Sequence, residues 1–492
     1  MVETTALVIG SGVGGLATAI RLARMGIRVR VFEKNEVPGG KISEIRANGY
    51  RFDTGPSLFT LPGLVDELQP GSGRALEYDK LDIISRYFFS DGTVFTAPAE
   101  PSLFARELAR VTGVSGDRIL RYLDDTRLLY EKSSPVFLFS AFHRLSKLFN
   151  AQNLGILRAM LRFNPLLSMH AYNQKALRNP QAVQLFDRYA TYNGSDPYKA
   201  PAMLNMIAHL EHNLGAYFSR GGMYQIVERL VQWALQLGVE FRYNQEVESI
   251  LIREGKATGI ITGGKEYPAD LVISAGDIFR TWSRLLPGER TPRRIKKPRL
   301  STSAMIFYLG VRKRFEQLDV HNIFFSGNYR EEFRALSPRK AAVMYPDPTV
   351  YVYNSSHLEP GDAPPGCSNL FVMINTPYDR GEDWEHLAIQ ARKNILKKLL
   401  AHGIGLEQVI EFEQVATPKS IDHATLSTAG ALYGNHSNSA LSAFNRHPNF
   451  SRRFPNLFFA GGSVHPGGGI PLCLASAKIV EDEVKSYLEN VS

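Results

Sequence analysis

The sequence predicts a mixed fold built from a discontinuous α/β domain, a mostly antiparallel sheet and a helical lid. A short apolar run, a glycine-rich turn and an amphipathic segment follow one another near the N-terminus, and again at 456–474. Strand-like runs lie between 300 and 380, and helical periodicity extends from about 100 to 215. A strand, a glycine turn and a helix start place free backbone N–H groups and a positive dipole beside a polar or anionic ligand. We therefore expect both ends of the chain to enclose one ligand.

The length and composition are those of a globular protein with two or three lobes. Of its 492 residues, 44% are hydrophobic and 21% are charged, which argues against disorder. Cys367 and Cys473 offer neither a disulfide framework nor a metal-binding spacing, so we expect a reducing cytoplasm. Residues 1–5 lead straight into a predicted strand, so we expect no signal peptide, and no apolar run is long enough to span a membrane.

The N-terminal segment has the pattern of a dinucleotide-binding βαβ unit. The apolar run Ala6–Ile9 is followed by Gly10-x-Gly12-x-x-Gly15, a helical pattern and a second strand that ends at Glu33. The first glycine permits the tight turn, the second lets a pyrophosphate approach the backbone, and the third lets helix and strand pack closely. The acid is placed to accept hydrogen bonds from a ribose diol. The expected contacts are Gly10, Gly12, Gly14, Gly15, Glu33 and Lys34.

Two further glycine-containing turns favour FAD over NAD. The turn Pro38-Gly39-Gly40-Lys41 and the FDTGPS stretch at 52–57 follow soon after the ribose acid. Such turns suit the ribityl chain and isoalloxazine of FAD, whereas NAD enzymes usually continue into more alternating βα units. The chain returns to this domain at 221–276, where the backbone of Val247 can meet the adenine edge. The expected contacts here are Gly40, Lys41, Gly55, Pro56, Ser57 and Val247.

The C-terminal stretch holds the second cofactor turn. An apolar strand at Leu457–Ala460 runs into a segment with five glycines, and the amphipathic segment Leu472–Leu488 follows. Backbone N–H groups around Gly469 and Ile470 are placed to stabilise negative charge on a flavin, as preorganised donors do in other sites. The expected contacts are Gly461, Gly462, Ser463, Gly469, Ile470 and Pro471.

These elements divide the chain into three parts. We expect a Rossmann-like FAD-binding domain to comprise residues 1–90, 220–290 and 420–492. The strand-like runs and a helix at Trp384–Ala401 predict a substrate-binding domain with a mixed or antiparallel sheet from residues 91–130 and 291–419. The helical lid is expected at 131–219.

The net charge of +9 is unevenly distributed. The stretch 133–186 contains no Asp or Glu but six Lys and Arg residues, and apolar residues recur at helical spacing over 137–149 and 156–167. Basic amphipathic helices of this kind can lie on an anionic lipid surface. An ordinary lid whose apolar face packs inward explains the pattern equally well. No aromatic-interleaved module indicates a nucleic-acid partner.

Five segments resemble one family along nearly the whole chain. They are VIGSGVGGLATAIRLARMG at 8–26, PGGK at 38–41, FDTGPS at 52–57, LEHNLGAYFSRGGM at 210–223 and AGGSVHPGGGIP at 460–471. The chain resembles the FAD-containing carotenoid desaturases of the bacterial CrtI type, within the amine-oxidase-like flavoproteins, which implies a glutathione-reductase-like fold. General flavin oxidases usually carry an acid where this chain has Ser463. The segment at 186–202 is more similar to the 1-hydroxycarotenoid 3,4-desaturase branch than to phytoene desaturases.

The resemblance implies FAD-dependent removal of two hydrogens from a C–C bond beside a long polyene. The substrate would be an acyclic or monocyclic carotenoid, and the electron acceptor a quinone or oxygen. An allylic hydride can leave because the resulting cation spreads along the polyene, so the enzyme mainly aligns the bond and excludes competing reactions. Carotenoids partition into bilayers, which favours a lid at 133–186 that docks monotopically on the inner face of the membrane.

Catalytic and substrate residues are less clearly indicated. His465 lies in the glycine stretch, where it either approaches the flavin or hydrogen-bonds the loop. Glu211 and Arg220 either line the substrate route or pair with each other or with backbone. Side chains that could contact the substrate or sense its hydroxyl, with packing as the alternative, are Tyr189, Tyr192, Asn193, Asp196 and Tyr217. His209 and His212 lie three apart without a third ligand, so we expect no metal site.

Four other functions share this fold. A phytoene-type multi-step desaturase or an FAD-dependent carotenoid isomerase would carry the same cofactor turns. Amine oxidation is disfavoured because the helical stretch lacks the acids that attract a polyamine. A non-enzymatic carrier of prenylated proteins is disfavoured because both cofactor turns are intact.

Overall fold

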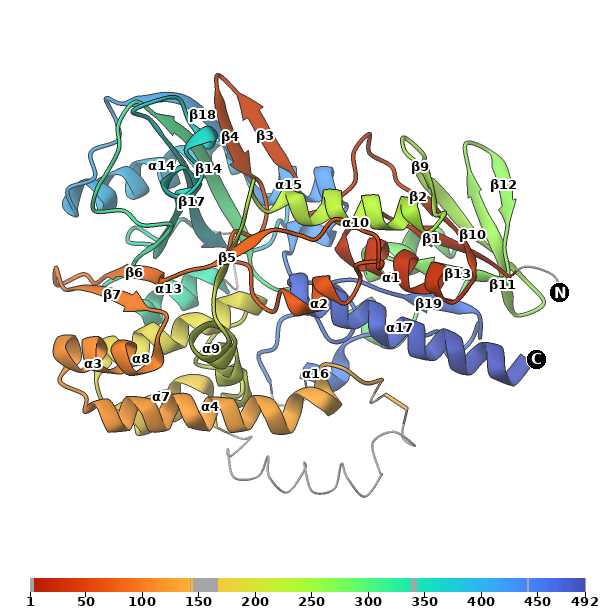
Figure 1. The fold of residues 1–492 in the computed structure, drawn as a ribbon, viewed down its shortest axis with the longest axis horizontal. Helices are drawn as coiled ribbons and strands as arrows, with labels where there is room; N and C mark the ends of the chain where they lie inside the picture. The colour runs from red at the N-terminus through yellow and green to blue at the C-terminus, as the bar shows by residue number, and fades with distance from the viewer. Residues whose placement is uncertain (1–3, 142, 145–166, 338–342, 440–441, 492) are drawn as a thin grey trace.

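The computed structural model describes residues 4–141, 143–144, 167–337, 343–439 and 442–491 (Figure 1). A parallel five-stranded sheet with the order β19-β13-β1-β2-β9 forms the centre of one half of the molecule. Its strands are β1 Thr5–Ile9, β2 Arg28–Phe32, β9 Glu240–Arg242, β13 Leu271–Ser274 and β19 Leu457–Phe459. Strands from three distant parts of the chain pair here, so this domain is discontinuous, as the sequence predicts.

The two faces of this sheet are covered differently. Ala6 and Val8 of β1 pack in one core with the helices α1 Val13–Arg24, α10 Tyr224–Gln236 and α17 Ile470–Val491. Leu7 and Ile9, which alternate with them, pack in another core with the antiparallel sheet β10 Val247–Arg253, β11 Lys256–Thr262 and β12 Lys265–Pro268. A strand buried on both faces reads as a continuous apolar run, which explains the pattern at the N-terminus.

A seven-stranded sheet forms the second half, with the order β18-β14-β17-β16-β15-β6-β7. The bounds are β6 Ile83–Phe88, β7 Val94–Pro98, β14 Ser303–Val311, β15 His321–Phe324, β16 Val350–Tyr353, β17 Ser368–Thr376 and β18 Ile410–Ala416. Strands β6 and β15 run parallel, and the other neighbours run antiparallel. The predicted mostly antiparallel sheet is therefore confirmed, and its outer face is covered by α14 Trp384–Ala401.

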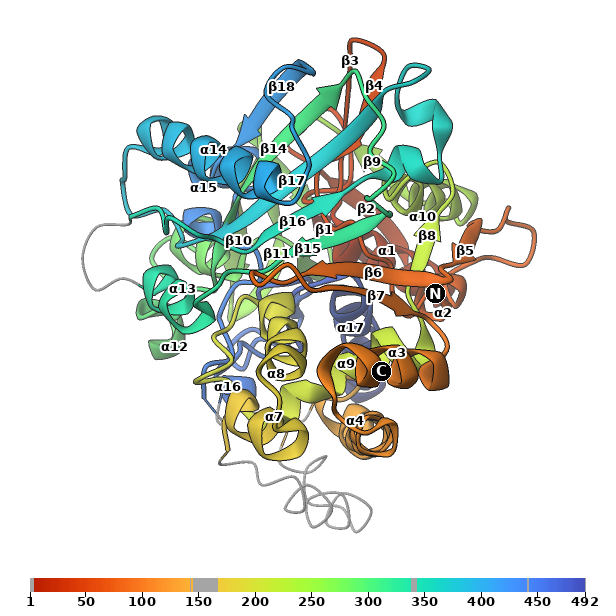
Figure 2. The ribbon, with the colours of Figure 1, turned by 90° about the vertical axis from the view of Figure 1, so that its left-hand side faces the viewer.

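Helices cover the inner face of the seven-stranded sheet (Figure 2). They are α3 Pro101–Thr112, α4 Gly116–Phe137, α7 Met169–Leu177, α8 Pro180–Asp187, η1 Arg188–Asn193, η2 Ala202–Asn205, α9 Met206–His209 and η3 Leu210–Leu214. The expected amphipathic helix over 137–149 is wrong at its start, because α4 ends at Phe137 and the described residues that follow form turns and bends. Residues 145–166, with most of both expected lid helices, lie outside the described residues.

Short elements complete the chain. They are β3 Glu44–Ala47, β4 Tyr50–Asp53, α2 Gly63–Asp66, β5 Tyr78–Lys80, β8 Tyr217–Ser219, α11 Ile278–Arg280, η4 Thr281–Leu285, α12 Arg293–Lys296, α13 Tyr329–Leu336, η5 Ser355–His357, η6 Pro360–Asp362, α15 Pro418–Thr425, η7 Thr428–Gly430 and α16 Ser442–Asn445. In the part of the chain that the structure describes, no helix combines the length and apolar character needed to cross a bilayer. The expected domain boundaries stay predictions.

Candidate active site

The two glycine-rich turns from opposite ends of the chain meet. A Cβ atom on Gly14 would lie 2.8 Å from the Cα of Gly461, a distance that real Cβ atoms do not reach. Both positions therefore require close backbone approach, which glycine allows. Gly10, Gly12 and Gly15 lie in the same β1–α1 turn. The sequence prediction that both termini contribute to one site is supported by this contact.

The turn at 38–41 lies on the N-terminal turn. Gly39 donates its N–H to the carbonyl of Ser11 at 3.0 Å, and Gly39 and Gly12 form a β-bridge. Gly40 lies against Gly12. Helix α1 starts just beyond, with no side-chain cap in the structure and no acid in its first turn. Uncapped N–H groups at a helix start suit a pyrophosphate, so this turn fits the expected nucleotide.

Glu33 is held at the end of β2 by short hydrogen bonds. One carboxylate oxygen accepts from the N–H and the hydroxyl of Ser11, at 2.9 and 2.8 Å, and the other accepts from the N–H of Asn35 at 3.0 Å. The Gln245 N–H donates to the backbone carbonyl of Glu33, which places the start of β10, and Val247 with it, near the predicted ribose acid. Glu33 and the start of β10 are therefore brought together, and their contacts with an adenosine moiety stay a prediction.

The lysines of this region bind backbone. Lys41 Nζ donates to the carbonyls of Ala431 at 3.1 Å and Leu432 at 2.6 Å, and burial lowers its pKa. Lys34 Nζ reaches the carbonyl of His423 at 3.4 Å. Both lysines tie the N-terminal turns to the C-terminal part of the chain.

The C-terminal turn leaves space at the start of α17. Gly469 has a φ of +105°, and a Cβ atom there would meet no described atom within 4 Å. Ile470 and Pro471 begin the helix directly after it. Open space at the start of a long helix suits a flavin, and the same stretch meets the N-terminal turn at Gly461 and Gly14, so the residues present fit FAD.

The other predicted residues of this stretch make structural contacts. The Gly461 N–H donates to Ser476 Oγ at 3.0 Å, and Gly462 lies against Gly468. The Ser463 hydroxyl accepts from the N–H of Ile278 at 2.9 Å. Other flavin oxidases usually carry an acid at this position. In this chain, the serine instead accepts a hydrogen bond from the first N–H group of α11.

His465 is almost fully buried, and its Nε2 donates to the carbonyl of Ser140 at 3.1 Å. Its own backbone is held by His447 and Asn449. Burial lowers the pKa of His465 to about 3, so the ring is neutral at physiological pH. These contacts agree with the alternative in which His465 hydrogen-bonds the surrounding loops. A catalytic role for His465 stays a prediction.

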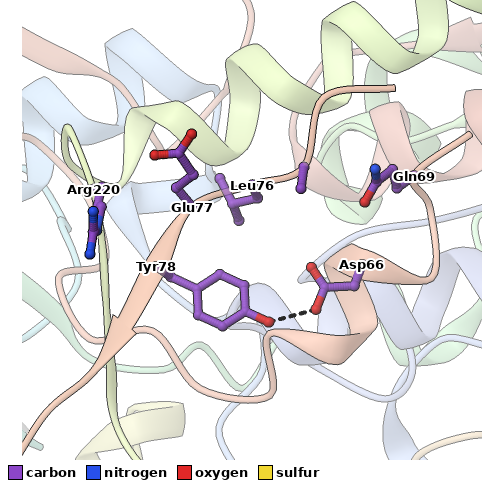
Figure 3. Close-up of a pocket in the computed structure, with 7 residues that line it drawn as sticks. Asp66, Gln69, Leu76, Glu77, Tyr78 and Arg220 are labelled. Atoms are coloured by element: carbon purple, nitrogen blue, oxygen red, sulfur yellow. Dashed lines mark hydrogen bonds between the residues drawn. The ribbon is translucent and has the colours of Figure 1, made fainter. Parts of the chain in front are cut away.

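Glu211 and Arg220 do not pair with each other. Arg220 is exposed and binds the carboxylate of Asp79, at 2.7 and 2.8 Å. It lines a surface groove of about 380 Å³ with Tyr78 and Asp66, which Figure 3 shows. Glu211 is buried instead. The alternative in which the two residues pair with each other is therefore wrong, because Arg220, directly after β8, lies at the surface.

Glu211 belongs to a buried polar cluster. Its carboxylate accepts hydrogen bonds from the hydroxyls of Tyr189, at 2.8 Å, and Tyr192, and from Arg188 at 3.3 Å. Burial alone would raise the pKa of Glu211, but Arg188, His212 and the hydrogen bonds from the two tyrosines together outweigh it, and the pKa is lowered. Arg188 also donates to the hydroxyl of Tyr87 on β6 at 3.0 Å. An ion pair thus lies inside an otherwise apolar core, where its partners hold it charged.

His212 extends this cluster, and burial lowers its pKa to about 4. Its Nε2 is 2.6 Å from the Tyr189 hydroxyl. Tyr189 and Tyr192, predicted from one sequence segment, are therefore brought together with Glu211. Sequence reasoning missed Arg188, although it stands directly before Tyr189.

A second polar chain starts in the FDTGPS turn. The hydroxyls of Ser57 and Tyr351 are 2.7 Å apart, and Tyr351 is 2.7 Å from His321 Nδ1. Ser57 follows Gly55 and Pro56 after β4, whereas Tyr351 and His321 lie on β16 and β15. This chain therefore connects a cofactor turn to the seven-stranded sheet, and no sequence spacing could have revealed it.

The remaining predicted substrate residues lie in other surroundings. Asp196 pairs with Lys199 at 2.8 Å and lines a pocket of about 230 Å³ with Arg299, Phe333 and Tyr378. Asn193 is buried at the end of η1. The Tyr217 hydroxyl donates to the carbonyl of Leu214 near the surface. The structure brings Tyr189 and Tyr192 into one cluster and leaves Asp196 and Tyr217 outside its hydrogen bonds.

Comparisons with known proteins agree with this geometry. Residues 13–484 match the family model described as flavin containing amine oxidoreductase. The chain is 46% identical to a 1-hydroxycarotenoid 3,4-desaturase of a Flavobacterium species, over 97% of this chain and 98% of the relative. It is 31% identical to a 4,4'-diapolycopene oxygenase of a Methylomonas species, over 98% of both chains. A phytoene desaturase of Fusarium fujikuroi is 30% identical, over 98% of this chain and 89% of the relative.

Solved structures confirm the fold. An oxidoreductase from Methanosarcina mazei aligns with a TM-score of 0.63 and 18% identity, over 98% of this chain and 100% of its own. A putrescine oxidase variant aligns with a TM-score of 0.65 and 15% identity, over 100% of this chain and 99% of its own. The chain therefore belongs to the flavin containing amine oxidoreductase family and is an FAD-dependent oxidoreductase of the carotenoid desaturase type.

Proposed function

We propose that this enzyme is an FAD-dependent 3,4-desaturase of acyclic or monocyclic 1-hydroxylated carotenoids. The observation that carries the proposal is the 46% identity, over nearly the full length of both chains, to a protein with that activity. The buried polar cluster around Glu211 also supports it, because a purely hydrocarbon substrate gives no reason to place polar groups beside its binding region.

The residues of this chain would mainly position the substrate. When bound, FAD supplies the two-electron acceptor for the hydride that leaves the allylic carbon. The carbon next to it loses a proton, so the substrate loses two hydrogens and gains one double bond. The inner face of the seven-stranded sheet, with Ile306, Tyr308 and Phe371, offers an apolar, aromatic surface against which a polyene can align.

The N–H groups at the start of α17 would stabilise the negative charge that reduction brings. Gly469 and Ile470 stand at the positive end of a long helix. Donors fixed before the reaction need no reorganisation, and one such donor is worth about 3–4 kcal/mol of transition-state stabilisation in well-studied sites.

We propose further that the enzyme collects its substrate from the inner face of the membrane and passes electrons to a quinone or to oxygen. The acid-free stretch 133–186 supports docking, and Lys175 and Arg178 of α7 are exposed. Arg144 does not contribute, because it pairs with buried Glu483 and stacks on Phe450 at 4.3 Å. Docking would therefore depend on the residues beyond Arg144.

Expression in cells that accumulate defined carotenoids tests the substrate. We expect 1-hydroxylated acyclic carotenoids to lose two mass units and to gain one conjugated double bond. Loss of more hydrogens from phytoene would favour the multi-step desaturase. A product of unchanged mass would favour the isomerase and contradict the proposal.

A further inference from the structure

His321 has one committed nitrogen and one open nitrogen, a pattern that it shares with His212. It is 2% exposed, and Nδ1 is bound to the Tyr351 hydroxyl. Nε2 is buried and has no hydrogen-bond partner within the described ranges. A buried polar atom without a partner is destabilising, so such an atom calls for a ligand.

The position of His321 in the sheet places it on the inner face. His321 pairs with Tyr353, and Ile323, two residues later, pairs with both Tyr351 and Tyr87. Residues two apart on a strand, and residues directly opposite on neighbouring strands, share one face. His321, Tyr351 and Tyr87 therefore project to the same side, which is the side that the helices cover.

The two polar chains meet on this face. Tyr87 binds Arg188 of the cluster around Glu211, and Tyr351 binds Ser57 of the cofactor turn. Neighbouring strands lie about 4.8 Å apart, so the tyrosines that flank Ile323 are roughly 10 Å apart. Glu211 and Arg188 both act electrostatically on His321. His321 therefore stands where the flavin domain, the sheet and the helical region come together.

The hydroxyls of Tyr189 and Tyr192 are already committed. Both donate to the carboxylate of Glu211, and Tyr189 also contacts His212. By contrast, Nε2 of His321 makes no hydrogen bond to any described residue. His321 can thus accept a new partner without breaking a bond that holds Glu211 in place. His212 also has an open nitrogen, but its other nitrogen is bound to Tyr189 of this cluster and its ring packs against Phe104 and Phe186.

The chemistry of the imidazole suits a hydroxyl group. Burial lowers the pKa of His321 to about 3, so the ring is neutral, and each of its nitrogens then either donates or accepts. A hydroxyl can do both, and it pairs with Nε2 whichever tautomer Tyr351 selects. An anion would gain little here, because the charges of Arg188 and Glu211 offset each other.

We propose that His321, held in place by Tyr351 and Ser57, is a specificity-determining residue that hydrogen-bonds the terminal hydroxyl of the substrate. This inference rests on the proposed function. In a 1-hydroxylated carotenoid, the hydroxyl-bearing carbon lies two bonds from the 3,4 bond, so its partner must stand close to the flavin. The chain that fixes His321 begins in a cofactor turn, at Ser57, as this requires.

The test compares a 1-hydroxylated carotenoid with the same polyene lacking the hydroxyl, both delivered in the same lipid vesicles. Binding is followed by quenching of tryptophan fluorescence, and turnover by product analysis. The wild-type protein should prefer the hydroxylated polyene by about 10- to 100-fold in Kd. His321→Phe should abolish most of that preference, and His321→Gln, whose amide can still hydrogen-bond, should restore part of it.

His402→Phe is the matched control. His402 contacts Phe88 and Phe324 among the residues that face away from the cluster, so this variant should keep the wild-type preference. If His321→Phe does not fold, Tyr351→Phe provides the second variant, because it frees the imidazole and should reduce the preference. Flavin absorbance confirms that each variant carries its cofactor.

The outcomes separate the two claims. A folded, flavin-loaded His321→Phe protein that keeps the wild-type preference would overturn the role of His321 while leaving the desaturase function intact. A wild-type protein that binds both polyenes equally would overturn it as well. A wild-type protein that prefers the hydroxylated polyene but never desaturates it would contradict the proposed function, and the same binding assay would still report on His321.

Discussion

Burial, rather than exposed charge, sets the behaviour of the interior side chains. Arg188 and Glu211 form a charged pair in the core, and three tyrosines surround the guanidinium at 5.0 to 5.4 Å from their ring centroids. Replacing one member of such a pair leaves the other charge buried without compensation. The pair is therefore expected to be sensitive to single substitutions and more tolerant of joint replacement.

Glu211→Gln should lower the free energy of unfolding by about 3–5 kcal/mol, because Arg188 keeps its charge and loses its counter-ion. The double variant Arg188→Met/Glu211→Met should be less destabilised than the single variant. Guanidinium unfolding of the flavin-loaded proteins measures both values. A Glu211→Gln protein as stable as the wild type would show that the carboxylate is not charged in the folded state.

Buried histidines predict loss of stability in mild acid. Burial lowers the pKa of His212 and His447 to about 4, and of His321 and His465 to about 3. Below the unfolded pKa of about 6.5 the unfolded chain binds protons that the folded chain does not, so stability falls as pH decreases. Each histidine contributes about 1.4 kcal/mol per pH unit in this window.

Glu332 acts in the opposite direction. Burial raises the pKa of Glu332 to about 7 in the folded chain. Between the pKa of the unfolded chain and this value, the folded chain keeps a proton that the unfolded chain has lost. The contribution of Glu332 to stability therefore falls as pH rises. Four histidines outweigh one glutamate. Denaturant midpoints should therefore fall steeply between pH 6.5 and 4.5, and a flat profile over this range would contradict the assigned neutral rings.

Residue roles were harder to predict than elements. Gly10, Gly12, Gly15 and Glu33 follow from spacing alone, because one short segment builds the whole βαβ unit. Ser57 and Tyr351 lie 294 residues apart in the sequence, so no local pattern reveals the polar chain that they form with His321. Pairing of Arg220 with Glu211 fails for a related reason, since a separation of nine residues does not show that the turn after β8 brings Arg220 to the surface.

At the scale of elements, the start of α17 and the β1–α1 turn define the cofactor site. Periodicity predicted α1, α14 and α17, because each is amphipathic or apolar and bounded by glycine or proline. The contact between Gly14 and Gly461 could be expected only as a general meeting of the two turns. Its close backbone approach depends on how α17 packs beside α1.

Gly469→Val should abolish retention of FAD. The side chain would fill the open space at the start of α17 and would be strained at a φ of +105°. Gly381→Val is the matched control, because Gly381 has a φ of +96° and equally open surroundings but lies in the loop before α14. The ratio of flavin to protein absorbance measures the effect. A yellow, active Gly469→Val protein would contradict the assigned site.

At the scale of the whole molecule, three parts meet around one interior region. The parallel sheet carries the cofactor turns, the seven-stranded sheet offers an apolar face, and the helical region covers that face (Figures 1 and 2). This division followed from the sequence, because strand, helix and glycine signals occupy different stretches. The lid at 133–186 is predicted from its basic charge, from apolar residues at helical spacing and from the lipophilic substrate, and residues 145–166 of it lie outside the described residues.

Membrane docking predicts a charge-dependent affinity for lipid. Lys175→Gln/Arg178→Gln should weaken co-sedimentation with anionic vesicles, because each cation near the surface contributes about 1 kcal/mol. Lys256→Gln/Lys265→Gln removes the same charge from the exposed hairpin of β11 and β12 and serves as the control. Equal binding by both double variants would exclude α7 as the docking surface.

The central claim, that this flavoprotein desaturates a carotenoid, is tested most directly by the mass of the product. The purified, flavin-loaded protein is incubated without oxygen with a 1-hydroxylated acyclic carotenoid and a quinone. The account predicts a product two mass units lighter, with absorption at longer wavelength, and reduction of an equal amount of quinone. A product of unchanged mass, or no consumption of quinone, would contradict it.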